Sequence, residues 1–146
     1  MKKINFLVIV LLIVVTALVS SCKKEAKIEK NLWNKGGEWN IESRVIKITS
    51  TIPSLNFNKT FYNWGTYTFK KDGNGNYTIT VNGSFETGTL TYSNTEDKLT
   101  LIINNQARVF DILEWEKDKM KIINTENITS GEESITNIQI FNLKKK

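Results

Sequence analysis

The sequence predicts an all-β protein, an eight-stranded antiparallel up-and-down meander that closes into a barrel. From residue 39 onward, short segments rich in Ile, Val, Thr, Tyr, Phe and Trp are separated by Asn, Gly, Asp and Lys, a pattern typical of strands and turns. No stretch keeps a helical period over three turns. Short loops favour pairing between successive strands, and closure removes the two open edges of such a sheet. A two-sheet β-sandwich is the alternative.

The first strand is predicted over residues 38–50. Trp39 and Ile41 lie on one face, whereas Ile46 falls on the opposite parity although it is equally apolar. A β-bulge adds one residue to a strand and thereby reverses the side on which the later side chains lie. We therefore expect a bulge near Val45 that directs the second half of the strand inward.

Turn residues divide the rest of the chain into seven further strands. Pro53 is expected to end the first strand and to open the longest loop, over residues 52–60, before a second strand at 61–71. Asp72-Gly73-Asn74-Gly75 is a strong hairpin signal because these residues accept positive φ angles. The remaining strands are predicted over residues 76–82, 84–93, 98–103, 106–115, 119–126 and 134–143.

Aromatic side chains make up the most informative group in the predicted barrel. An eight-stranded barrel has room for its own side chains or for one small ligand, so these residues either line a ligand cavity or fill the interior. Trp64 has the opposite parity to its strand neighbours, which makes it a candidate exposed contact residue. The candidate cavity residues are Trp39, Tyr67, Phe69, Tyr77 and Tyr92.

The first residues have the features of an export signal. Two lysines at positions 2 and 3 precede an apolar run over residues 4–19, which ends in small residues. The run is shorter than the roughly 20 residues that span a bilayer. The sequence therefore predicts a cleavable signal peptide over residues 1–21 rather than a transmembrane anchor.

The end of this signal, Leu18-Val19-Ser20-Ser21-Cys22, resembles the bacterial lipobox. The resemblance implies cleavage before Cys22 and lipid attachment, including palmitate, to its thiol. Each buried CH₂ contributes about 0.8 kcal/mol, so two or three acyl chains hold a domain at a membrane. The charged residues that follow predict a flexible tether over residues 22–37, ahead of a barrel domain at 38–146.

The destination of the exported chain is also an expectation from resemblance. Lys23 and Lys24 stand where some lipoproteins carry an Asp that retains them in the inner membrane. The expected location is therefore the cell envelope, at the outer membrane. Whether the domain lies on the periplasmic or the surface face is left open.

Four segments of the barrel domain give it a family resemblance. They are the Trp motif at 37–41, a Gly-x-Tyr-x-Phe phrase at 65–77, a Gly-Thr-Leu-x-Tyr segment at 88–92, and two apolar strands around a charged turn at 110–122. Together they resemble the lipocalin-like lipoproteins of Bacteroidetes. This resemblance implies an eight-stranded barrel that binds a small molecule without catalysis.

Composition argues against several other functions. The chain contains no His and a single Cys, so it lacks a base that titrates near neutral pH and a His/Cys set for zinc. Asp72-x-Asn74-x-Asn76 lacks the Gly and Glu of a calcium loop. We therefore expect no catalytic residues, no metal and no cofactor. The net charge of +5 is modest and Arg occurs only at positions 44 and 108, which argues against nucleic-acid binding.

Together these observations predict a monomeric, membrane-anchored, non-enzymatic lipocalin-like lipoprotein. Its expected partners are the membrane, through lipid on Cys22, and a small apolar or amphipathic ligand. The alternative is a protein-interaction module with a solid core and no small ligand, which docks through a sheet face or the loop at 52–60.

Overall fold

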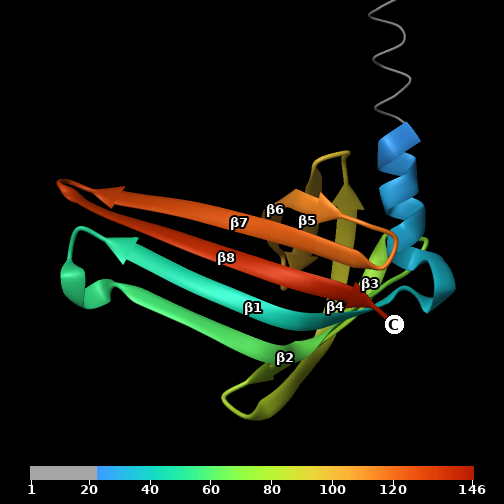
Figure 1. The fold of residues 1–146 in the computed structure, drawn as a ribbon, viewed down its shortest axis with the longest axis horizontal. Coiled ribbons are helices and arrows are strands. Elements are labelled where there is room, and N and C mark those ends of the chain that lie inside the picture. The colour runs from blue at the N-terminus through green and yellow to red at the C-terminus, as the bar shows by residue number, and fades with distance from the viewer. Residues whose placement is uncertain (1–22) are drawn as a thin grey trace, which may run out of the picture.

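The computed structural model describes residues 23–146, and it shows eight antiparallel strands that follow one another around a closed barrel (Figure 1). The barrel closes because the first and last strands pair over nearly their whole lengths. The predicted meander barrel is confirmed, and the sandwich alternative is wrong. The strands are β1 (Glu38–Ser50), β2 (Phe57–Phe69), β3 (Asn74–Val81), β4 (Ser84–Asn94), β5 (Lys98–Ile103), β6 (Gln106–Trp115), β7 (Lys119–Ser130) and β8 (Glu133–Lys145).

The strands match the predicted ones closely, with two main differences: β7 continues to Ser130, beyond the predicted end at residue 126, and the segment at residues 52–60 is mostly not a loop. The expected loop contains only a short 3₁₀ helix, η2 (Pro53–Leu55), and β2 already begins at Phe57. Phe57 pairs with Ile48 of β1, so the ladder between β1 and β2 satisfies the backbone groups of this segment. The segment is therefore strand rather than loop.

Four strands continue beyond the barrel. β7 and β8 pair as far as Ser130 and Glu133, whereas pairing between β6 and β7 stops at Asp111 and Ile123. The outer halves of β1, β2, β7 and β8 consequently form a four-stranded sheet that projects to the left in Figure 1. We call this sheet the extension; it comprises residues 46–50, 57–61, 124–130 and 133–139.

A bulge in β1 decides which side chains in the second half of this strand point into the barrel. The register of β1 against both neighbouring strands shifts between Ile41 and Ser43, a few residues before the predicted position near Val45. The shift places the next inward position at Arg44. On β2 the same irregularity adds one residue, at which Asn63 takes a φ of 50°, and it brings Trp64 inward.

Residues 23–33 form a helix that packs on one end of the barrel, followed by the 3₁₀ helix η1 (Asn34–Gly36) (Figure 1). Ile28 and Leu32 lie one turn apart on this helix and are fully buried. The indole Nε1 of Trp39 donates a hydrogen bond to the carbonyl oxygen of Leu32 at 2.9 Å. This arrangement differs from the solvated tether expected here, because two apolar residues at helical spacing are enough to dock a charged segment.

The helix end of the barrel is filled with side chains. The rings of Phe69 and Tyr92 meet edge to face, with centroids 4.9 Å apart, and Trp39 packs on Trp115 at 6.5 Å. The Tyr92 hydroxyl donates to the carbonyl oxygen of Lys70 at 2.6 Å. This end is therefore a solid core that the helix covers.

Within the described part of the chain, no helix has the length and apolar character needed to cross a membrane. The predicted signal peptide at 1–21 and Cys22 lie outside the described residues.

Candidate ligand-binding site

A cavity of about 280 Å³ lies at the end of the barrel opposite the helix. The two strands β4 and β6 show that the cavity and the helix lie at opposite ends. Glu86 and Gln106, near the first residues of these strands, line the cavity. Asn94, the last residue of β4, instead donates a hydrogen bond to the Glu25 carbonyl oxygen of the helix. The buried rings that form the inner wall of the cavity are Tyr67, Tyr77, Phe110 and Phe141.

The five predicted cavity residues divide between the two ends of the barrel. Tyr67 and Tyr77 line the cavity. Trp39, Phe69 and Tyr92 lie in the solid core beneath the helix instead. Two of the five residues therefore line a cavity, and the other three fill the interior at the opposite end of the barrel.

Trp64 occupies a different position from the exposed one expected for it. Its ring is half-buried and lines the cavity, and it meets Phe141 edge to face at 5.9 Å. The guanidinium carbon of Arg44 lies 4.3 Å from the Trp64 ring centroid and 5.5 Å from that of Phe141. Such stacking of Arg on aromatic faces is favourable, more so when the groups are desolvated.

Arg44 is the central polar group of the site. Its Nη2 donates to Gln139 Oε1 at 2.8 Å, while its buried Nε has no hydrogen-bond partner. None of the ion pairs found among residues 23–146 includes Arg44. Desolvation lowers its pKa from the ordinary value, and the like charge of Arg108 acts in the same direction. Arg44 is thus a partly buried cation without an acidic partner in the described chain.

Arg108 on β6 also lines the cavity, and it is more exposed than Arg44. The chain has only these two arginines, so the fold brings both to one cavity. Glu86 lines the same cavity and accepts a long hydrogen bond of 3.5 Å from the Tyr77 hydroxyl. Burial raises the pKa of Tyr67 to about 12, so its phenol keeps its proton and remains a hydrogen-bond donor.

The sequence interpretation gave the two arginines no part in the site. Arg108 carried a usable signal, since it shares its strand parity with the buried Phe110. No such signal was available for Arg44, because its side chain points inward only when the β1 bulge lies between Ile41 and Ser43. Among residues 23–146, no group of three or more His, Cys, Asp or Glu is placed to hold a metal ion. What the site offers is an aromatic and aliphatic wall with a few hydrogen-bond donors, an arrangement suited to binding a small molecule.

Comparison with known proteins gives no family. No family model matches the chain, and no curated protein matches its sequence. Solved structures with some likeness include a deswapped triple mutant of bovine odorant-binding protein (TM-score 0.34, 14% identity, 71% of each chain) and an odorant-binding protein, OBP1 (TM-score 0.33, 15% identity, 73% of this chain and 71% of that one). A third is bovine odorant-binding protein complexed with its natural ligand (TM-score 0.32, 13% identity, 72% and 71%). At this level of similarity the likeness carries no functional argument.

The fold itself defines the class of protein. Eight antiparallel strands in sequence order around a closed barrel are the lipocalin-like architecture. One end of this barrel is filled and covered by a helix, and the other contains a cavity. The protein is therefore a lipocalin-like barrel with a candidate ligand-binding site.

Proposed function

We propose that this protein is a non-enzymatic binding protein that holds a small apolar or amphipathic molecule inside its barrel. The observation that carries the proposal is the cavity of about 280 Å³ walled by aromatic and aliphatic side chains. Its volume is close to the lower end, about 300 Å³, of cavities that bind small molecules. The occupant is accordingly a small molecule or one with a short tail.

The proposal is tested with the uncharged fluorescent probe N-phenyl-1-naphthylamine and the mature chain carrying Cys22→Ser. Ile103 lines the cavity, whereas its neighbour Ile102 is 40% exposed on the outer face of β5. Saturable binding at one site is expected, and Ile103→Trp should weaken it at least about tenfold by filling the cavity, while the matched Ile102→Trp should not. Absence of saturable binding, or equal behaviour of both variants, would contradict the proposal.

The same proposal includes attachment to a membrane by lipid on Cys22. It is supported by the lipobox-like residues 18–22 and by the short apolar run before them. Growth of a bacterial host with an alkyne analogue of palmitate should label the wild-type chain and Ser21→Ala, but not Cys22→Ser. Labelling that persists in Cys22→Ser, or is absent from the wild-type chain, would contradict lipid attachment. We propose the outer membrane as the site of attachment, since Lys23 and Lys24 stand where an inner-membrane retention signal carries Asp. Recovery of the labelled chain in the inner-membrane fraction would contradict this location.

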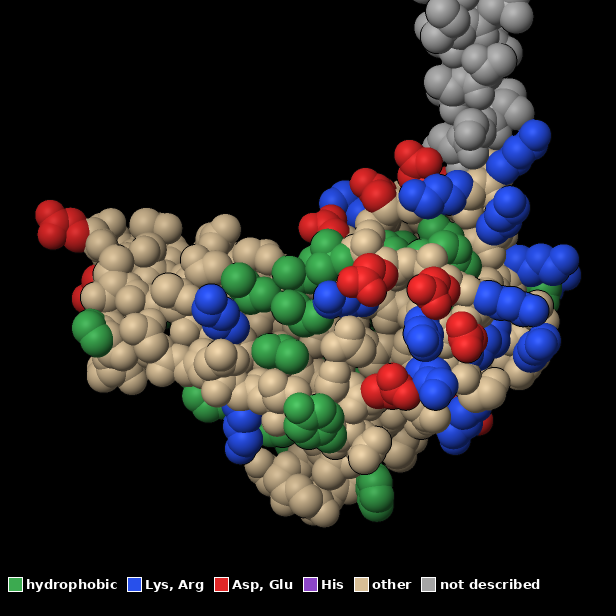
Figure 2. All heavy atoms as spheres, in the orientation of Figure 1, with side chains coloured by type: hydrophobic (Ala, Val, Ile, Leu, Met, Phe, Trp, Pro, Cys, Tyr) green, Lys and Arg blue, Asp and Glu red, His purple; other side chains and the backbone are tan. Residues whose placement is uncertain are grey.

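A second candidate function, docking of another envelope protein, is favoured by the extension. Phe57 is 43% exposed there and Ile128 is 59% exposed. Figure 2 shows that charged side chains gather over the barrel, whereas the viewed face of the extension carries few. A photo-cross-linking amino acid at Ile128 should then capture a defined partner that the same group at Thr87, on the barrel, does not. Recovery of the monomer alone from both positions would argue against docking.

A further inference from the structure

Partial burial of the Arg44 guanidinium carries a desolvation penalty. A desolvated charge requires a charged or hydrogen-bonding partner to offset the loss of water. Arg44 has one hydrogen bond, from Nη2 to Gln139 Oε1 at 2.8 Å, and its buried Nε has none. Gln139 is an amide and supplies no negative charge. Arg44 lines the cavity, so a cation that has no acidic partner among the described residues lies beside the space that a ligand would occupy.

The two rings around Arg44 fix the orientation of its guanidinium. Its carbon lies 4.3 Å from the centroid of Trp64 and 5.5 Å from that of Phe141. Stacking of this kind holds a guanidinium plane while leaving its N–H edge free for hydrogen bonds. A planar oxyanion can accept two parallel hydrogen bonds from such an edge, an arrangement stronger than one between neutral groups.

Arg108 brings a second positive charge to the same cavity, on the side of the β5–β6 hairpin. Two like charges that face one cavity disfavour each other, as the effect of Arg108 on the pKa of Arg44 shows. Among residues 23–146, Glu86 is the only acidic side chain that lines this cavity, and no ion pair within 4 Å joins it to either arginine. A bound anion would compensate both arginines at once.

We propose that the ligand is an amphiphile with a single oxyanion head, which Arg44 and Arg108 bind together, and with a short apolar tail that packs against the aromatic wall. This inference deepens the proposed function and rests on it. It identifies a chemical class, exemplified by medium-chain carboxylates, rather than neutral apolar molecules. The cavity lining contains both kinds of group that such a molecule needs, the two guanidinium groups for its head and the aromatic and aliphatic side chains for its tail.

Three probes of matched chemistry test the inference: decanoate, 1-decanol and acetate. Each competes with N-phenyl-1-naphthylamine for the mature chain carrying Cys22→Ser. Decanoate should bind at least about tenfold more tightly than 1-decanol, because a charged hydrogen bond contributes at least that much. Acetate should compete weakly, since it has no tail to bury. Equal binding of decanoate and 1-decanol, or failure of both to displace the probe, would overturn the inference and leave the proposed function intact, whereas absence of saturable probe binding would remove the proposed function as well.

Charge-removing variants locate the head. Arg44→Gln and Arg108→Gln should each reduce decanoate affinity about tenfold or more while 1-decanol affinity stays constant. Arg108 is exposed, so Arg108→Gln tests the inference even if Arg44→Gln perturbs folding.

The matched control for these variants is Lys47→Gln, which removes the same charge from an exposed position of β1 and should change neither affinity. If Lys47→Gln lowers decanoate binding as much as the arginine variants do, the effect is one of net charge and the inference is wrong. If acetate binds as tightly as decanoate, the site is one for free anions and the amphiphile is excluded.

Discussion

Tyr67 makes the stability of the barrel sensitive to alkaline pH. Burial raises the pKa of its phenol from the ordinary 10.0 to about 12, against the opposing effect of Arg44 and Arg108. Below pH 10 both the folded and the unfolded states keep the proton, so the stabilisation is fully present. Between pH 10 and 12 the unfolded state loses the proton first, so the free energy of unfolding falls as pH rises.

We therefore expect the barrel to lose roughly 2–3 kcal/mol between pH 9 and pH 12 through Tyr67. Urea unfolding followed by Trp fluorescence at several pH values measures this loss. Tyr67→Phe should reduce the slope of stability against pH in that range, whereas Tyr62→Phe, at a position 75% exposed on β2, should not. The same slope in wild type and Tyr67→Phe would show that burial of this phenol is not its source.

Gly88 is required by the ring that crosses it. A Cβ at this position would lie 2.7 Å from two ring carbons and the hydroxyl oxygen of Tyr77, a side chain that lines the cavity. Gly88→Ala should therefore lower the free energy of unfolding by about 1–3 kcal/mol through overpacking. Thermal unfolding of Gly88→Ala and of the exposed neighbour Thr87→Ala makes the comparison. Equal melting temperatures for the two variants would show that the ring can move aside at no cost.

At this scale the sequence predicts the inward-facing aromatic side chains better than the polar residues of the cavity. Alternation of apolar and polar residues was enough to predict that Tyr67 and Tyr77 point inward, because both lie in regular parts of their strands. Arg44 and Trp64 follow irregularities in β1 and β2. A bulge can form at several adjacent positions of one strand with similar local energy, and the pairing of three strands decides among them. The polar part of the site could not be predicted from the sequence for this reason.

The N-terminal helix is an element that tertiary contacts stabilise. At 11 residues it is shorter than the 12–15 residues at which isolated helices become marginally stable. Its burial of Ile28 and Leu32, together with the Trp39 hydrogen bond, holds it on the barrel. Average composition hides this arrangement, since the segment is mostly charged and only the spacing of its two aliphatic residues reveals a buried face.

Leu32→Ala should accordingly detach the helix or destabilise the whole barrel. Removal of a fully buried leucine side chain costs about 2–5 kcal/mol. Hydrogen exchange of residues 23–33, together with urea unfolding, separates these two results. The exposed Lys30→Ala provides the matched control on the same helix. Wild-type protection and stability in Leu32→Ala would mean that the helix contributes nothing to the closed end.

Strand boundaries were predictable where the turns are local. Asn82 and Gly83 have φ angles of 51° and 81°, and Asn104 and Asn105 have 52° and 61°. Two successive positive φ values are the geometry of tight hairpins that match the twist of the adjoining strands, and Asn and Gly tolerate it. The hairpins therefore form as their sequences indicate. The early start of β2 was missed because its partner strand, rather than its own residues, makes it a strand.

At the scale of the whole molecule, ligand binding and folding are linked. A ligand that binds only the folded barrel raises its stability by about 2.7 kcal/mol at a concentration of 100 times Kd. Decanoate should thus raise the melting temperature of the mature chain with Cys22→Ser, and Ile103→Trp should abolish the rise. A rise of the same size in Ile103→Trp would place the decanoate outside the cavity.

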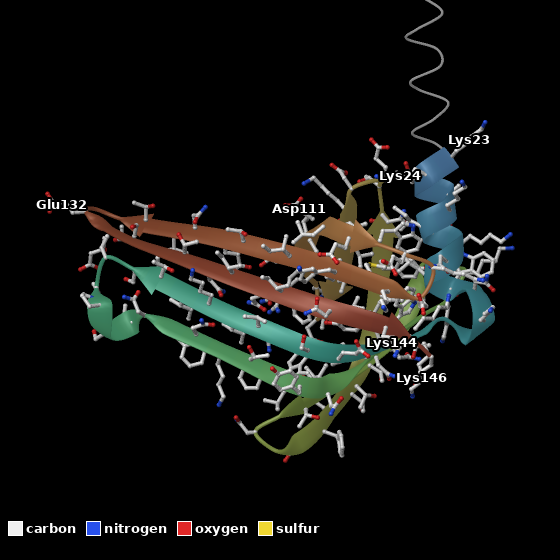
Figure 3. All side chains as sticks on the ribbon, viewed as in Figure 1. Lys23, Lys24, Asp111, Glu132, Lys144 and Lys146 are labelled. Carbon is white, nitrogen blue, oxygen red and sulfur yellow. The ribbon has the colours of Figure 1, made fainter. Side chains whose placement is uncertain are left out.

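Closure of the barrel was predictable from short connections, but the extension was not. Every strand is joined to the next by a connection of at most six residues, which makes sequential pairing the simplest topology. The lengths of the ladders depend on partners far apart in the chain, such as β1 with β8. Figure 3 shows the outcome, with Glu132 at the tip of the extension, far from Lys23 and Lys24 on the helix.

The helix and the cavity occupy opposite ends of the barrel, and this polarity gives the molecule a direction. Cys22 directly precedes Lys23, at the outer end of the helix (Figure 3). If Cys22 carries lipid, as we propose, the membrane anchor is attached at the helix-covered end of the barrel. The end that contains the cavity then lies away from the membrane, on the aqueous side. The ligand would then enter from the aqueous phase or from another protein there, rather than directly from the lipid leaflet that holds the anchor.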